Sequence, residues 1–133
     1  ILKNFLINSD TANIVADTFY IKMDGQEVFK FAVSKVPECI NQVLEKAGKT
    51  PDDIDYYILH QANVRIISSV AKRLHISEDK IPVNLHKYGN TSAASIPILL
   101  DELRRDGTLK SGQKIIFSGF GGGLTWGASY MEI

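Results

Sequence analysis

Residues 56–65 read Tyr56-Tyr57-Ile58-Leu59-His60-Gln61-Ala62-Asn63-Val64-Arg65, an apolar run followed by a polar segment. Four consecutive apolar residues without polar alternation are typical of a strand covered on both faces. Beyond the polar segment, apolar residues recur at helical spacing on one face: Val64, Ile67, Val70, Ala71 and Leu74. The pattern predicts a strand that leads directly into a helix, with His60 at the junction.

A longer helical pattern precedes this strand. From about residue 26, apolar residues recur three or four positions apart, and Gly48 supplies a C-cap. Pro37 lies inside the pattern, and because proline has no backbone N–H we expect a kink or a break there. Thr50-Pro51-Asp52-Asp53 predicts a capped single turn. Residues 1–8 and 19–21 predict short strands farther upstream.

In the downstream half, predicted strands and helices alternate in the same way, which indicates an α/β fold. Its mixed sheet would follow the order βαβαβαββ along the chain. The predicted elements after the second helix are an extended piece at 81–83, a loop at 85–90, a helix capped by Thr91 or Ser92, a strand at 114–118, a glycine turn at 121–123 and a final strand at 124–133.

Composition excludes several classes of protein. The chain has 133 residues, 44% hydrophobic and 23% charged, which suits one globular domain. Lys+Arg and Asp+Glu both number 15, so net charge gives no case for nucleic acid or an anionic membrane as partner. No apolar run approaches the roughly 20 residues that span a bilayer. One cysteine excludes an intrachain disulfide and fits a reducing compartment, so we expect a cytoplasmic location.

Three polar or glycine-rich segments follow predicted strands or precede predicted helices. They contain His60, Asn90 and the glycines 121–123, and in α/β sheets such segments gather at the carboxyl ends of the strands. Taken singly, His60 fits a structural histidine, Asn90 a turn residue and the glycines a tight hairpin. The glycines are a poor phosphate loop, because a strand follows them and the Walker lysine is missing.

Three motifs together carry a resemblance to a known family. They are His60-Gln61-Ala62-Asn63-x-Arg65, then Tyr88-Gly89-Asn90-Thr91-Ser92-Ala93-Ala94-Ser95-Ile96-Pro97, then Gly119-Phe120-Gly121-Gly122-Gly123-Leu124-Thr125-Trp126-Gly127. In this order they resemble the C-terminal half of β-ketoacyl-acyl-carrier-protein synthase III, a condensing enzyme with the thiolase fold. The segment 23–30 also resembles the start of that half, so the match covers about residues 20–133.

The resemblance implies a mechanism. In the family a cysteine takes the acyl group from acyl-CoA, and malonyl carrier protein then loses carbon dioxide to form an enolate. His60 and Asn90 would donate hydrogen bonds to the enolate oxygen. The backbone N–H of Gly122 would help to hold the oxyanion formed in the condensation step. Acyl-CoA and malonyl carrier protein are substrates, and the resemblance implies no metal or other cofactor.

The resemblance also implies contacts with the substrates. Gln61, Ala62, Asn63, Val64 and Arg65 match the segment around the carrier protein and its pantetheine arm. Lys30 would join Arg65 in a basic spot for the acidic carrier protein, although both also fit ordinary solvated surface. The residues matched to the CoA tunnel are Gln26, Phe29 and Phe120. The family often has Asn at the position of Gln26, and Phe120 would pack beside the nucleophile. Trp126 fits hairpin packing better than ligand contact.

The family's nucleophile has no counterpart in this chain. Cys39 lies on the apolar stripe of a helix, where a free cysteine behaves as a buried hydrophobe. We therefore expect the cysteine in an N-terminal half outside this chain, with residues 1–18 as the end of that half plus a linker and 19–133 as the C-terminal domain. The chain lacks an initiator Met. Its segment 10–20 is shorter than the family's usual connection. We expect this chain to be inactive alone. The complete protein would form a homodimer.

Two alternatives remain from the residues. One is a non-catalytic module that binds a partner or carrier protein, against which the retention of both His60 and Asn90 argues. The other is a related thiolase-fold enzyme, such as a polyketide starter synthase or hydroxymethylglutaryl-CoA synthase. The run Asn90-Thr91-Ser92-Ala93-Ala94-Ser95 favours the fatty acid initiator or its close relatives.

Overall fold

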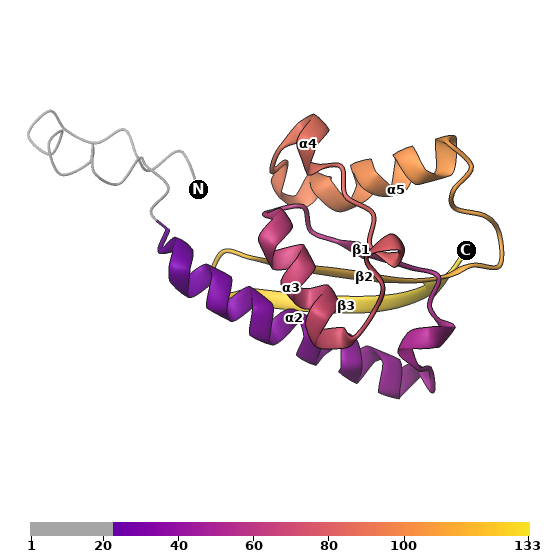
Figure 1. Ribbon diagram of the computed structural model, residues 1–133, viewed down its shortest axis with the longest axis horizontal. Coiled ribbons are helices and arrows are strands. Elements are labelled where there is room, and N and C mark those ends of the chain that lie inside the picture. The colour runs from indigo at the N-terminus through magenta and orange to yellow at the C-terminus, as the bar shows by residue number, and fades with distance from the viewer. Residues whose placement is uncertain (1–22) are drawn as a thin grey trace, which may run out of the picture.

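The computed structural model describes residues 23–133 (Figure 1), so the strands and linker expected within 1–22 lie outside the described residues. A sheet lies between two helical layers, with α2 and α3 on one face and α5 on the other. The elements are α2 (Gly25–Ala47), β1 (Tyr56–Leu59), α3 (Val64–Leu74), α4 (Leu85–Tyr88), α5 (Ser95–Arg105), β2 (Lys114–Gly121) and β3 (Thr125–Glu132).

The sheet is mixed, as predicted. Its order is β1-β2-β3, with β1 parallel and β3 antiparallel to the central strand. Tyr57 lies opposite Ile116 and Leu59 opposite Ser118. Because β1 and β2 run in the same direction, their carboxyl ends share one edge of the sheet. The two segments that leave this edge begin with His60 and Gly122.

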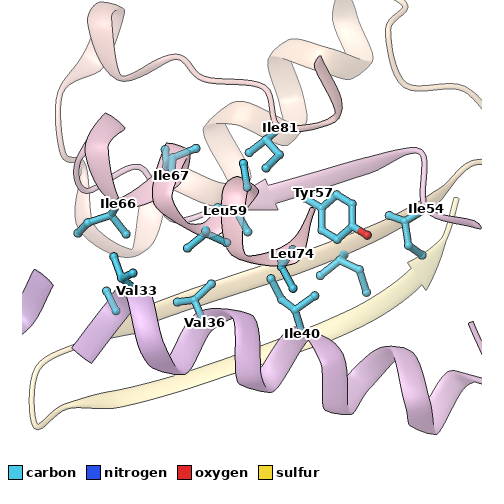
Figure 2. Close-up of a cluster of buried hydrophobic side chains, with 14 of the residues drawn as sticks. Val33, Val36, Ile40, Ile54, Tyr57, Leu59, Ile66, Ile67, Leu74 and Ile81 are labelled. Atoms are coloured by element: carbon cyan, nitrogen blue, oxygen red, sulfur yellow. The ribbon is translucent and has the colours of Figure 1, made fainter. Parts of the chain in front are cut away.

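The two faces of the sheet bury separate hydrophobic clusters, since side chains alternate along a strand. Figure 2 shows the larger cluster, in which Tyr57 and Leu59 of β1 meet α2 and α3. On the opposite face, Ile58 and Ile115 pack against α5 through Leu99 and Leu103 (a second cluster that also contains Leu109). Both faces of β1 are therefore covered, as its continuous apolar run predicts.

The predicted end of helix α2 at Gly48 is confirmed, but the helix does not break at Pro37. Asp24 caps its first turn by accepting hydrogen bonds from the N–H groups of Gln26 and Glu27, at 3.0 and 3.1 Å. Gly48 ends it in the left-handed region, with φ 62°. The helix continues through Pro37, which is buried. Core packing of the neighbouring Val36 and Ile40 outweighs the lost backbone hydrogen bond.

The segment between α3 and α5 differs from its prediction. Ile81 is buried, but residues 81–83 form no strand; Pro82 has no N–H for a sheet ladder. The predicted loop at 85–90 contains the short helix α4. A 3₁₀ turn over Ser92–Ala94 precedes α5, and Thr91 makes no side-chain capping bond. Within residues 23–133, the third strand of the predicted order is therefore absent.

Two smaller expectations have mixed outcomes. The capped turn at residues 50–53 is confirmed, since Thr50 and Asp53 bond reciprocally around Pro51. Val64, expected on the inner face of α3, is 46% exposed, and Ile66 is buried instead.

Across the part of the chain that the structure covers, no helix combines the length and apolarity needed to cross a bilayer.

Candidate active site

A cavity of about 590 Å³ opens at the edge of the sheet where β1 and β2 end. Its walls come from three segments: residue 60 after β1, residues 90–96 before and within α5, and residues 119–127 of the β2–β3 hairpin. The predicted meeting of these segments is confirmed. Of the residues predicted to act in catalysis or substrate binding, those lining the cavity are His60, Asn90, Phe120 and Gly122.

His60 is held on several sides. Its backbone N–H continues the ladder to the carbonyl of Ser118, at 2.9 Å. Nδ1 lies 2.7 Å from the Oγ of Ser95, and the ring of Phe120 meets the imidazole edge-on at 5.3 Å between centroids. Burial lowers the pKa of His60 below its usual range, because desolvation disfavours the charged ring. Burial therefore favours the neutral imidazole, which carries one N–H.

Asn90 is oriented by its own turn. Its Oδ1 accepts a hydrogen bond from the backbone N–H of Ser92 at 2.9 Å, as in an Asx turn. With the oxygen engaged, the amide Nδ2 is left to donate. Gly89, which precedes it, ends α4 with a positive φ of 68°. The sequence motif thus presents a donor at the cavity wall.

A buried glutamine connects the two sides of the site. Gln61 is 0% exposed, and its Nε2 donates to the carbonyl of Leu59 at 2.9 Å while its Oε1 accepts from the N–H of Asn84 at 3.2 Å. Its backbone N–H donates to Ser95 Oγ at 3.2 Å. The side chain therefore joins the end of β1 to the segment before α4, away from the surface on which the carrier protein was expected.

Replacing Gln61 with methionine should destabilise the fold by about 1–3 kcal/mol, because the buried N–H of Asn84 loses its acceptor. A lower urea midpoint of the complete protein would show this. Gln42→Met, at an exposed position of α2, is the matched control and should leave the midpoint nearly unchanged. Equal midpoints for both variants would contradict the structural role of Gln61.

Glu102 holds α4 against α5, and so positions the loop that carries Asn90. Its carboxylate accepts from Asn84 Nδ2 at 2.6 Å, Tyr88 OH at 2.9 Å and Lys87 Nζ at 3.0 Å. The hydrogen bonds from Asn84 and Lys87 lower the pKa of Glu102 below its ordinary 4.5. Tyr88 lies two residues before Asn90, so this cluster fixes one end of the loop.

This cluster predicts an acid-sensitive contribution to stability. Because folding lowers the pKa of Glu102, its ionised form stabilises the fold above pH 4.5, and this contribution disappears as the pH falls through the lowered value. Glu102→Gln should flatten the dependence of melting temperature on pH in that acidic range, measured by calorimetry. Glu45→Gln, at an exposed position of α2, should keep the parental profile. A parental profile in Glu102→Gln would refute the assignment.

The β2–β3 hairpin forms one wall of the cavity, to which it contributes backbone atoms and two aromatic rings. Gly122 lies in the turn between β2 and β3, and a Cβ there would meet no described atom within 4 Å. Packing within the described residues therefore does not require a glycine at this position. Trp126, for which hairpin packing was favoured over ligand contact, also lines the cavity while it packs edge-on against Phe31 at 5.4 Å. Phe120 lines the same wall.

The remaining predicted contact residues lie outside this cavity. The Arg65 guanidinium sits over the Phe29 ring at 5.9 Å, which brings the starts of α2 and α3 together. Asn63 caps α3 by accepting from the N–H of Arg65 at 2.8 Å. Lys30 is exposed and pairs with Glu27 at 2.7 Å. Gln26 and Val64 are exposed, and Ala62 is partly buried. Val64 lines a second cavity together with Ile81 and Val83.

Cys39 has the environment of a structural thiol. It is buried on α2, and its Sγ donates to the carbonyl of Val36 at 3.2 Å. Burial raises the pKa of the thiol, although a contact with Ser118 opposes this. A thiol protonated at neutral pH is a poor nucleophile, in agreement with the sequence-based prediction.

Sequence reasoning missed Ser95. It lies inside a quoted motif, yet its contact with His60 joins residues 35 positions apart, which no local pattern reveals. The sequence alone offers little indication of this contact, because a serine at the first turn of a helix usually suggests a cap.

The comparisons with known proteins agree with this architecture. A family model described as "3-Oxoacyl-[acyl-carrier-protein (ACP)] synthase III C terminal" matches residues 44–133. The beta-ketoacyl-[acyl-carrier-protein] synthase III of Clostridium novyi is 56% identical over 112 residues, covering 84% of this chain and 35% of that protein. The protein of the same name from Staphylococcus aureus (strain JH1) is 55% identical over 112 residues, covering 84% and 36%. The chain thus spans about a third of the length of the curated relatives it matches.

Solved structures share the same arrangement. The crystal structure of 3-oxoacyl-[acyl-carrier-protein] synthase III from Aquifex aeolicus matches with a TM-score of 0.84 and 51% identity, covering 86% of this chain and 37% of that one. The priming beta-ketosynthase from the R1128 polyketide pathway matches with a TM-score of 0.80 and 36% identity, covering 84% and 34%. The chain belongs to the family of 3-oxoacyl-[acyl-carrier-protein] synthase III C-terminal domains, and its α/β core is the C-terminal half of a thiolase-like fold.

Proposed function

We propose that this chain supplies the decarboxylation half of a condensing active site that starts fatty acid synthesis. A cysteine outside the chain carries an acyl group as a thioester. A malonyl thioester on acyl carrier protein loses carbon dioxide, and the electron pair of the broken C–C bond forms an enolate. The enolate carbon attacks the acyl thioester and releases the cysteine thiolate, giving a 3-oxoacyl product.

The observation that carries this proposal is the meeting of His60 and Asn90 at one cavity. Each side chain has one polar atom fixed by the fold, Nδ1 by Ser95 and Oδ1 by the Ser92 N–H, and each has a nitrogen left to bind a ligand. Two preorganised donors on the wall of one cavity suit a negative oxygen that appears during the reaction. The enolate oxygen of the malonyl thioester is such an atom, and Gly122 N–H would serve the oxyanion of the condensation step.

The surface formed by the starts of α2 and α3 suits the carrier protein. Arg65 is exposed above Phe29, and Lys30 is exposed nearby along α2. We assign the pantetheine arm and the CoA substrate to this surface and the cavity, with Asn63, Ala62, Val64, Gln26 and Phe120 along the path. Gln61 would support that path from inside.

Assays of the chain with and without the rest of the protein test the proposal. We expect no acyl loading by residues 1–133 alone, and loading plus condensation once the complementary half with its cysteine is supplied. Efficient condensation of acyl-CoA with malonyl carrier protein by this chain alone would refute it. Binding of carrier protein by the complete protein with no decarboxylation would favour the non-catalytic module.

Priming of polyketide synthesis is a second candidate, favoured by the match to the R1128 priming beta-ketosynthase. The decarboxylation and condensation steps would be the same, so His60 and Asn90 keep their roles. Comparing carrier proteins from fatty acid and polyketide synthesis as malonyl donors to the complete protein separates the two. We expect the higher kcat/KM with the fatty acid carrier protein.

A further inference from the structure

We propose that Ser95 is a positioning residue that fixes the tautomer of His60, placing the single ring proton on Nε2. The inference rests on the proposed role of His60 as a hydrogen-bond donor to the enolate. It concerns a neutral imidazole, which can hold its proton on either nitrogen but can donate into the cavity from only one of them.

Ser95 is in a position to control the ring. It is the first residue of α5 and is 2% exposed. Its Oγ lies 2.7 Å from His60 Nδ1 and 3.2 Å from the backbone nitrogen of Gln61. The Gln61 N–H can only donate, so Ser95 Oγ accepts there. The bond to His60 then decides where the hydroxyl proton points.

Counting protons separates the two possible tautomers. If Nδ1 carried the proton, Ser95 Oγ would accept from both nitrogens, and its own O–H would need another acceptor. Within residues 23–133, Ser95 Oγ has no hydrogen-bond partner besides these two nitrogens. A buried hydroxyl proton without an acceptor is costly. If Ser95 instead donates to an unprotonated Nδ1, every proton has a partner.

The second ring nitrogen then faces the ligand space. Nε2 makes no hydrogen bond to another described residue, yet none of the buried side-chain nitrogen or oxygen atoms in that part of the chain lacks a partner. Nε2 is therefore accessible, and the surface that His60 exposes lines the cavity. With the proton on Nε2, the imidazole is a ready donor before any substrate arrives.

Nitrogen NMR of the complete protein with ¹⁵N-labelled histidine tests the tautomer directly. The His60 signals are assigned by their disappearance in His60→Ala. At neutral pH we expect an unprotonated, pyridine-type Nδ1 and a protonated, pyrrole-type Nε2. A pyrrole-type Nδ1 with an unprotonated Nε2 would overturn the proposal, and this measurement needs no variant at position 95.

Variants at position 95 test the consequence for the reaction. Ser95→Ala should slow malonyl decarboxylation about tenfold, shift the Nδ1 signal toward an average of the two tautomers and leave acyl loading unchanged. Ser95→Thr retains the hydroxyl and should restore both readouts; Ser111→Ala, in an exposed turn, is the control. Parental tautomer and rate in Ser95→Ala would overturn the proposal. Unchanged decarboxylation in His60→Ala would instead refute the proposed function and leave the NMR result standing.

Discussion

Replacing His60 with alanine in the complete protein should slow malonyl decarboxylation about 10²–10³-fold, the usual cost of one oxyanion donor. The imidazole lines the cavity, and its Nδ1 is already committed to Ser95, so the variant removes a donor held in place by the fold. The proposed function assigns acyl loading to a cysteine outside this chain, so we expect loading to stay close to the parental rate. Carbon dioxide release from malonyl carrier protein and mass spectrometry of the acyl-enzyme measure the two steps separately.

The control for this variant is a histidine that shares none of these contacts. His75 is exposed at the C-cap of α3 with φ 54°, and asparagine tolerates that conformation, so His75→Asn should keep both rates. Loss of both steps in His60→Ala, together with a lower melting temperature, would indicate a structural histidine. Retention of decarboxylation would exclude His60 as a donor to the enolate.

Replacing Asn90 with aspartate should reduce decarboxylation at least as strongly, by about 10²–10³-fold. One carboxylate oxygen can still accept from the N–H of Ser92, so the loop keeps its turn. The other oxygen then presents a negative charge where Asn90 presents its amide Nδ2. Repulsion of the enolate adds to the loss of the donor, so Asn90→Asp should be slower than Asn90→Ala. Steady-state rates of carbon dioxide release give this order.

The comparison of the two Asn90 variants has its own internal control. Asn90→Ala removes the Oδ1 contact with Ser92 as well as the donor, whereas Asn90→Asp keeps that contact and replaces the donor with a negatively charged oxygen. If loop geometry were the whole role of Asn90, the aspartate variant would be nearly normal and the alanine variant slow. That order of rates would contradict a hydrogen bond from Asn90 to the enolate.

The parts of the site that follow strand ends could be predicted from the sequence. His60 directly follows an apolar run, and the Gly119–Gly127 motif follows another, so a parallel pairing of the two strands was enough to bring them together. Asn90 was predicted as a site residue from the motif at residues 88–97. Hydrogen bonds between distant elements could not be predicted in this way. The link from Ser95 to His60 and the link from Asn84 to Glu102 depend on how α5 packs against its neighbours.

The errors occur where local preference and tertiary packing disagree. Pro37 favours a break by its chemistry, yet α2 continues through it because both neighbouring turns bury apolar side chains. Ile81 and Val83 have strand propensity, but Pro82 between them cannot donate to a ladder. The loop expected at 85–90 forms α4, which Glu102 holds through Lys87 and Tyr88.

The most direct test of the central claim compares the two half-reactions in the double variant His60→Ala/Asn90→Asp of the complete protein. Pre-steady-state acyl loading from acyl-CoA and carbon dioxide release from malonyl carrier protein are measured on the same preparation. We predict loading at the parental rate and decarboxylation reduced to the background seen without enzyme. Impaired loading with persistent decarboxylation would contradict the assignment of this chain to the decarboxylation half of the site.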